Sequence, residues 1–190
     1  RSLGLASTEC TGTGFKHLTA LKKLESVNFH HTPLNNAGLQ AISKVNISDR
    51  LWFAHTHFTD EGVTCLASLK QLRRCGIGSK EPGSSGKAVT TLAKLPLEDL
   101  ALLDSQASSE GVAHAAKIKT LRRLDVSYGP TVDDAALKLV AQMPQLEEFK
   151  IGYAAVTDKG IEALAKSKSL KKLTLSRLKN VSEAAIKSLQ

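Results

Sequence analysis

The sequence predicts a single α/β solenoid, in which short parallel strands build one curved sheet and helices cover its outer side. The first observation is an internal repeat, because residues 58–66 and 156–164 share one pattern of apolar, hydroxyl, acidic and glycine positions. The second is composition: 42% of the residues are hydrophobic and only 4% are aromatic, which favours a core of many small aliphatic contacts. The length suits one domain over residues 1–190.

Eight strands are expected, each marked by two apolar residues separated by one position, a spacing typical of a half-buried strand. The pairs recur every 24 or 25 residues along the chain. A further leucine usually stands three positions before each pair, and Ser48 takes this place in the third repeat. The first members of the pairs are Leu3, Val27, Leu51, Cys75, Leu100, Leu124, Phe149 and Leu173.

A helix of about eight to ten residues is expected after each strand. Hydroxyl residues stand before acidic residues and an apolar run, which is the pattern of a helix N-cap with negative charge in the first turn. One such unit cannot bury its own apolar face, so the units are expected to stack. Strands pack more closely than helices, so the stack is expected to curve. The predicted N-caps are Thr59, Ser108, Thr157 and Ser182.

A small residue precedes the first apolar residue of every predicted helix, and we expect a larger side chain there to obstruct the neighbouring turn. In the fourth repeat, residues 80–87 are rich in glycine, proline and serine, which predicts an exposed loop. Leu3, Leu5, Ile186 and Leu189 are expected to be partly exposed at the two ends, where flanking sequence or self-association would cover them. The small column is Gly14, Gly38, Gly62, Ala88, Gly111, Ala136, Gly160 and Ala185.

The consensus Leu-x-x-Leu-x-Leu, followed by a turn and Thr/Ser-Asp/Glu-x-Gly-apolar-x-x-Leu, resembles the leucine-rich repeat family. The repeats are similar to the ribonuclease-inhibitor-like and cysteine-containing types, found in F-box substrate-recognition subunits of ubiquitin ligases and in many bacterial repeat proteins. The asparagine or cysteine usual in the turn is absent here. The resemblance implies a non-enzymatic scaffold whose concave sheet binds a protein or peptide partner.

The net charge of +8 and the isoelectric point near 9.5 raise the question of nucleic acid or an anionic surface as partner. However, charges entering successive strands alternate in sign from the fourth strand onward, which predicts a ladder of cross-strand ion pairs. Because this ladder neutralises the arginines, we favour a protein partner over nucleic acid. The predicted rungs are Arg74, Asp99, Arg123, Glu148 and Lys172.

Several other functions find little support. The sequence has no apolar run long enough to span a membrane. Cys10, Cys65 and Cys75 occupy apolar positions of the repeat and are predicted to be buried, reduced and inert. The loop before Lys87 lacks the glycine and hydroxyl spacing of a phosphate-binding loop. No Ser-His-Asp set or carboxylate pair emerges beyond the predicted ladder, so neither an enzyme nor a cofactor is predicted.

Four histidines gather in one region. His31 and His55 share a column of neighbouring strands and should nearly touch, and Asp104 lies in that column two strands on. A metal site would need His30 or His57 as well, but strand alternation points His30 to the other side. We therefore interpret these residues as surface histidines, with a metal site as the alternative.

The predicted binding surface is centred on Trp52. This residue lies between the core positions Leu51 and Phe53, so parity places it on the concave face, largely exposed beside Gly76. Trp52 packed flat over a neighbour is the alternative. Tyr128 and Tyr153 share another column, at the edge where strands turn. The predicted partner-binding residues are Asn28, Arg50, Trp52, Arg74, His31, His55, Tyr128 and Tyr153.

Two other functions stay open at this point. The chain would serve as a structural repeat segment of a longer protein if it binds only through its ends. It would act as a basic nucleic-acid or anionic-surface binder if its charges are not neutralised. Salt-dependent retention on heparin or DNA separates this last function from protein recognition.

Overall fold

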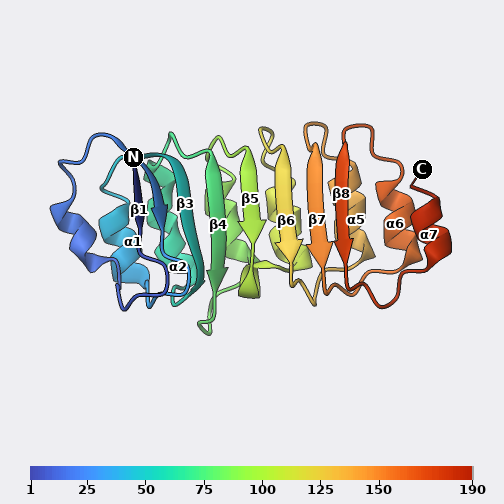
Figure 1. Ribbon diagram of the computed structural model, residues 1–190, viewed down its shortest axis with the longest axis horizontal. Coiled ribbons are helices and arrows are strands. Elements are labelled where there is room, and N and C mark those ends of the chain that lie inside the picture. The colour runs from blue at the N-terminus through green and yellow to red at the C-terminus, as the bar shows by residue number, and fades with distance from the viewer. Residues whose placement is uncertain (190) are drawn as a thin grey trace.

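Eight parallel strands form one open sheet in the computed structural model, which describes residues 1–189 (Figure 1). The strands follow one another in chain order, so each repeat adds one strand beside the last. β1 and β8 lie at opposite ends of the sheet (Figure 1). This arrangement confirms the predicted α/β solenoid. The strands are β1 (Ser2–Gly4), β2 (Leu24–Asn28), β3 (Ile47–Thr56), β4 (Arg74–Ser79), β5 (Asp99–Leu102), β6 (Arg123–Ser127), β7 (Glu148–Gly152) and β8 (Lys172–Ser176).

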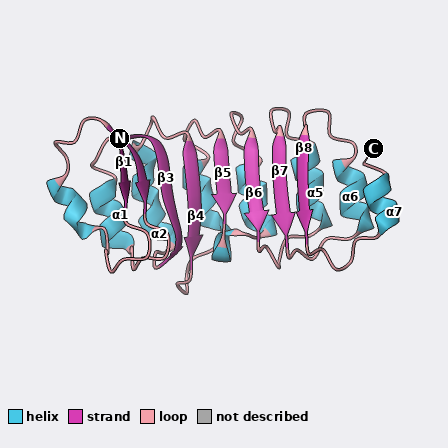
Figure 2. Ribbon diagram, viewed as in Figure 1, coloured by secondary structure: helices cyan, strands magenta, loops and turns pink. Residues whose placement is uncertain are grey.

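Helices form a second layer on one side of the sheet and leave the other side open (Figure 2). They are shorter than predicted, and the longest, α5, has eight residues. The connections between successive strands also contain 3-10 turns and extended segments. In the described residues no helix is long and apolar enough to cross a membrane. The α-helices are α1 (Asn36–Ile42), α2 (Asp60–Val63), α3 (Val89–Leu92), α4 (Ser109–Ala115), α5 (Asp134–Ala141), α6 (Asp158–Leu164) and α7 (Glu183–Lys187). The 3-10 segments are η1 (Thr13–His17), η2 (Thr64–Ser68), η3 (Gly86–Ala88) and η4 (Asp104–Gln106).

The core runs between the sheet and the helices. In the second to seventh repeats both residues of each strand pair are buried, from Val27 and Phe29 to Phe149 and Ile151. Ser48, which breaks the pattern in the third repeat, is explained by an irregularity at the start of β3. There Ile47 pairs with Leu24 and takes the core position in place of Ser48.

The small column marks close contacts between repeats, as predicted. A Cβ on Gly38 would overlap the Thr11 carbonyl oxygen, and one on Gly62 would overlap the Asn36 side chain. Gly14 is the exception, because the space around it is open within 4 Å. Gly14 belongs to the first repeat, so among the described residues no earlier repeat packs against it.

The starts of several helices are hydrogen-bonded to the preceding repeat, a contact that the repeat pattern alone does not predict. Asp134, the first residue of α5, accepts hydrogen bonds from the Thr157 amide (2.7 Å) and hydroxyl (2.6 Å). These acidic residues therefore fasten neighbouring repeats, in addition to favouring their own helix dipole. The same arrangement joins Asp60 to Ser85, Asp158 to Ser182 and, with an amide in place of the carboxylate, Asn36 to Thr59.

This use of the N-cap hydroxyls changes the predicted capping. Ser108 and Ser182 accept a hydrogen bond from their own helices, whereas the Thr59 and Thr157 side chains make no cap bond. The two threonine hydroxyls are held by the preceding repeat instead. The Ser182 amide and hydroxyl also lower the pKa of Asp158, because both donate to its carboxylate.

The cysteines are not equally buried, so the expectation that all three lie in the core is only partly correct. Cys75 is fully buried, and burial raises the pKa of its thiol. Cys10 and Cys65 are only half-buried. At the two ends of the stack Leu3, Leu5 and Leu189 are half-buried, and Ile186 is exposed.

Candidate binding surface at the ends of the strands

A residue in the left-handed conformation follows the core pair in nearly every repeat. Each stands four positions after the first core residue of its strand, with φ between 50° and 65°. Non-glycine residues rarely adopt this conformation, and each costs roughly 1–3 kcal/mol unless its surroundings impose it. The residues are Ser7, His31, His55, Asp104, Tyr128, Tyr153 and Arg177.

Several of the left-handed residues extend the backbone ladder by one more hydrogen bond. The His31 amide donates to the Ala54 carbonyl (3.0 Å), and the Tyr128 amide donates to that of Gly152 (3.0 Å). Strict alternation would send these side chains into the core, but the left-handed turn directs them outward. We call the resulting row the strand-end column: His31, His55, Asp104, Tyr128, Tyr153 and Arg177.

The second half of the strand-end column is an aromatic stack. The Tyr128 and Tyr153 rings lie 4.7 Å apart at an interplanar angle of 17°, and the Arg177 guanidinium lies 4.9 Å from the Tyr153 ring centroid. Tyr128 is 60% exposed. Exposed aromatic rings fixed on a backbone of this kind are typical of contact residues.

The first half of the column is a histidine cluster. The His31 and His55 rings stack with centroids 4.4 Å apart, as their shared column predicts. His30 joins them, with its ring centroid 4.4 Å from that of His31 and 5.0 Å from that of His55. The expectation that His30 points away from His31 and His55 was wrong, because the left-handed conformation turns the His31 and His55 side chains outward, toward His30. Burial, and then the neighbouring imidazoles His31 and His55, lower the pKa of His30.

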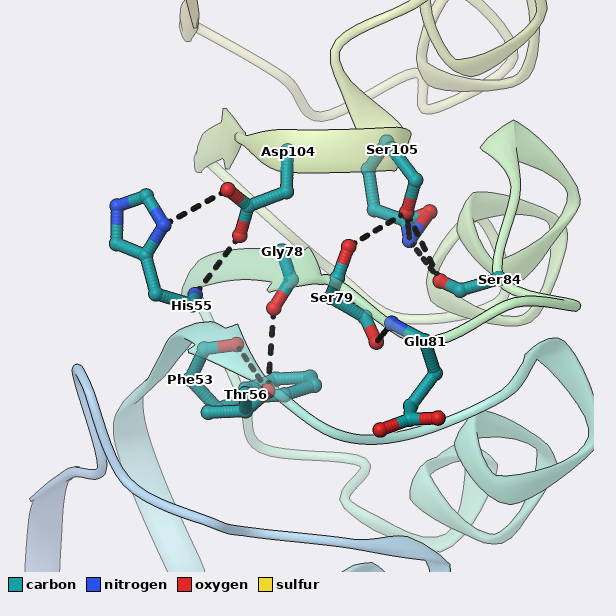
Figure 3. A network of polar contacts seen from close by, with 10 residues as sticks. Phe53, His55, Thr56, Gly78, Ser79, Glu81, Ser84, Asp104 and Ser105 are labelled. Carbon is teal, nitrogen blue, oxygen red and sulfur yellow. Dashed lines mark hydrogen bonds and ion pairs between the residues drawn. The ribbon is translucent and has the colours of Figure 1, made fainter.

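Asp104 reaches His55 across the intervening repeat (Figure 3). Its Oδ2 accepts the His55 backbone amide at 2.9 Å, and its Oδ1 lies 2.7 Å from His55 Nδ1. This second contact is a close ion-pair distance without hydrogen-bond geometry. Gly78 makes the approach possible, because a Cβ there would come within 2.7 Å of the carboxylate.

A polar network supports the turn beside this contact (Figure 3). The buried Gln106 donates from Nε2 to the Ser105 hydroxyl (2.8 Å), which donates in turn to the Ser79 carbonyl (2.9 Å). His57, the fourth histidine of the region, lies apart from the cluster. Its Nδ1 is 2.6 Å from Glu81 Oε1, so this exposed histidine is hydrogen-bonded to the loop after β4.

Trp52 lies on the open face as predicted, but it is half-buried and not largely exposed. Its ring covers Gly76 of the next strand, so closely that a Cβ on residue 76 would overlap the ring. The space left by the glycine is therefore filled by the indole. Asn28, on the other side of Trp52, accepts the His30 amide through Oδ1 (2.8 Å).

Arg74 pairs with Asp49 of the preceding strand and not with Asp99, the partner that the predicted ladder gives it. Its guanidinium holds the Asp49 carboxylate, with Nε 3.0 Å from Oδ1. Arg50 lies opposite Arg74 in the sheet register and is exposed. Among residues 1–189, the structure shows no ion pair for Arg50.

The predicted ladder has the expected register, but only some rungs form ion pairs. Asp99 pairs with Arg123 at 3.1 Å and Glu148 with Lys172 at 3.4 Å. Lys150 and Asp125, on the open face itself, add a pair at 3.0 Å. A parallel row one residue earlier contains Arg73–Glu98, Arg122–Glu147 and Lys171–Glu147.

Comparison with known proteins places this geometry in a fold family. The whole chain aligns with an internalin, InlF, from Listeria monocytogenes strain 4b F2365, at a TM-score of 0.51 and 15% identity. It also aligns over its whole length with TLR13 in a TLR13–ssRNA13 complex, at a TM-score of 0.61 and 16% identity. The fold is a leucine-rich-repeat solenoid.

The chain spans 65% of the internalin chain and 31% of the TLR13 chain. No protein-family model matches the sequence, and no curated protein matches it. At these identities the leucine-rich-repeat structures establish the fold of this chain alone.

Proposed function

We propose that this leucine-rich-repeat protein is a non-enzymatic recognition scaffold that binds a protein partner with the strand-end column and the adjoining open face. The observation that carries the proposal is the stack in which half-buried Tyr153 lies between exposed Tyr128 and exposed Arg177. Tyrosine and arginine are enriched among residues that dominate binding energy. Here the left-handed turns fix their backbone, so little conformational entropy is lost on binding.

The general class is supported by the fold, because leucine-rich-repeat solenoids such as internalins and Toll-like receptors are typically interaction scaffolds. The repeats would belong to the ribonuclease-inhibitor-like or cysteine-containing subtype. At the histidine end of the column, the contact would continue onto the open face of strands β2 and β3. There it would include Asn28, Arg50 and Trp52.

Nucleic acid is the second candidate partner. Stacked tyrosines beside an arginine are a platform on which unpaired bases could stack, and the similar TLR13 structure is a complex with ssRNA13. Against it, the cations of the open face are largely paired: Arg74 with Asp49, Arg123 with Asp99 and Lys150 with Asp125. This neutralisation favours a protein partner.

Binding measurements separate the candidates. A partner captured from source lysate should bind purified wild-type protein, and the double variant Tyr128→Ala/Tyr153→Ala should bind at least about 10-fold more weakly. Leu139→Ala is the matched control, because Leu139 is 38% exposed on α5, on the helical side. Labelled single-stranded RNA should bind weakly at physiological salt.

Three outcomes would count against the proposal. Tight RNA binding that falls steeply with salt and is lost in the double variant would establish the nucleic-acid function. Equal loss of protein binding in the Leu139→Ala control would place the interface on the helical side. Full partner binding by the double variant would leave the chain as a structural segment that binds through its ends.

A further inference from the structure

The histidine cluster has features that recognition of a protein does not require. One ring nitrogen from each of His30, His31 and His55 lies within 4.8 Å of the others. His30 Nδ1 is buried and has no hydrogen-bond partner among the described residues. Packing three imidazoles together is unfavourable when they are charged, and a cation between them would turn the same geometry into an attraction.

The distances allow a metal ion after small side-chain rotations. Zinc binds imidazole nitrogen at about 2.0–2.1 Å, which places tetrahedral ligand atoms roughly 3.3 Å apart. The backbone that carries the ligands is already fixed. His31 donates its amide to Ala54 (3.0 Å), His30 donates its amide to Asn28 Oδ1 (2.8 Å), and His55 donates its amide to Asp104 Oδ2 (2.9 Å).

Asp104 supplies the second feature of a built metal site. Its Oδ1 lies beside His55 Nδ1, so the other ring nitrogen, Nε2, is left facing away from the carboxylate (Figure 3). A histidine ligand whose second nitrogen faces a carboxylate is the usual arrangement at protein metal sites, where the carboxylate fixes the ring and raises its basicity. Gly78 serves the same contact by leaving room for Asp104.

From this geometry we infer that His30, His31 and His55 bind one divalent transition-metal ion, with Asp104 positioning His55. Imidazole ligands suit zinc, copper and nickel. Three protein ligands leave a fourth coordination position for water or for a side chain of a bound partner. Because the site lies on the strand-end column, the metal would belong to the same surface as the proposed protein contact, but its binding does not depend on that proposal.

Calorimetric titration of chelator-treated protein with ZnCl₂ tests the inference. About one Zn²⁺ per chain should bind, and His31→Ala, at an exposed position, should weaken binding at least about 10-fold. Asp104→Asn should also weaken it by about 10-fold or more, since a neutral amide supports His55 less well. His57→Ala is the matched control and should bind as wild type, because His57 faces Glu81.

A spectroscopic measurement keeps the test independent of variant folding. In wild-type protein, Zn²⁺ should shift the imidazole NMR signals of His30, His31 and His55 and leave those of His57 and His114 in place. Absence of Zn²⁺ binding at millimolar concentration would overturn the inference. So would binding that is lost in His57→Ala and retained in His31→Ala.

Discussion

At the scale of single residues, Trp52 and Gly76 act as one unit. The indole is half-buried because it occupies the space above the glycine. Parity places Trp52 on the open face, but its exposure depends on the residue beside it. The tryptophan therefore contributes to folding as well as to the surface offered to a partner.

Gly76→Ala should displace the Trp52 ring, because the new Cβ would overlap it. We expect a red shift of the tryptophan emission, faster acrylamide quenching and a loss of stability of roughly 1–2 kcal/mol. Trp52 is the only tryptophan, so the signal is unambiguous. Gly4→Ala is the control, since Gly4 stands in the same column with open space around it. Unchanged emission in Gly76→Ala would show that the ring does not rest there.

The three cysteines should react with a thiol reagent at different rates in the native protein. Cys75 is fully buried and its thiol pKa is raised, so it should react only on unfolding. Half-buried Cys10 and Cys65 should react faster, Cys65 held back by the burial that raises its pKa. Mass spectrometry of timed labelling measures the order. Early modification of Cys75 would place that strand outside the core.

At the scale of elements, the close contacts between repeats explain the small column. Gly62→Val should destabilise the protein by about 2 kcal/mol or more, because a side chain would displace Asn36 from its hydrogen bonds to Thr59. Gly14→Val is the matched control, with open space around it, and should cost much less. Urea denaturation compares the two. Equal losses would mean that crowding between repeats is not the reason for the small residues.

The link between successive helix starts makes a second prediction. Asp134→Ala should cost about 1–2 kcal/mol and speed hydrogen exchange at the Thr157 amide, because both bonds to Thr157 are lost. Asp134→Asn should retain much of the stability, since Asn36 holds Thr59 in the same way. If Asp134→Asn were as unstable as Asp134→Ala, the negative charge would matter more than the hydrogen bonds.

At the scale of the whole molecule, the periodic pattern was sufficient to predict the fold. Regularly spaced apolar pairs specify the strands, and the parallel order follows because each repeat buries its face only against the next. Ser48 is only an apparent exception, because a local shift in the register between β2 and β3 places Ile47 in the core. Helix length was overestimated, because sequence patterns do not separate a helical turn from a 3-10 turn.

The candidate surface was predicted less completely, for a physical reason. The alternation rule holds only while the backbone is extended, and it fails at the left-handed residues that follow the core pairs. For this reason the side chains of His31 and His55 were wrongly expected to point away from His30. The sequence itself indicates where alternation fails, since strict alternation would place the polar side chains of four residues in the core. These residues are His31, His55, Asp104 and Arg177. Pairing of Arg74 with Asp49 instead of Asp99 depends on side-chain reach, which register alone does not determine.

Site-specific photo-crosslinking tests most directly whether partners bind at the strand-end column. A benzophenone amino acid replaces Tyr128 in one protein and Leu139 in another. These residues lie in one repeat, the first on the strand-end column and the second on the helical side. We predict a discrete protein crosslink from position 128, suppressed by excess unmodified protein, and none from position 139. The same crosslink from both positions, or from position 139 alone, would contradict the account.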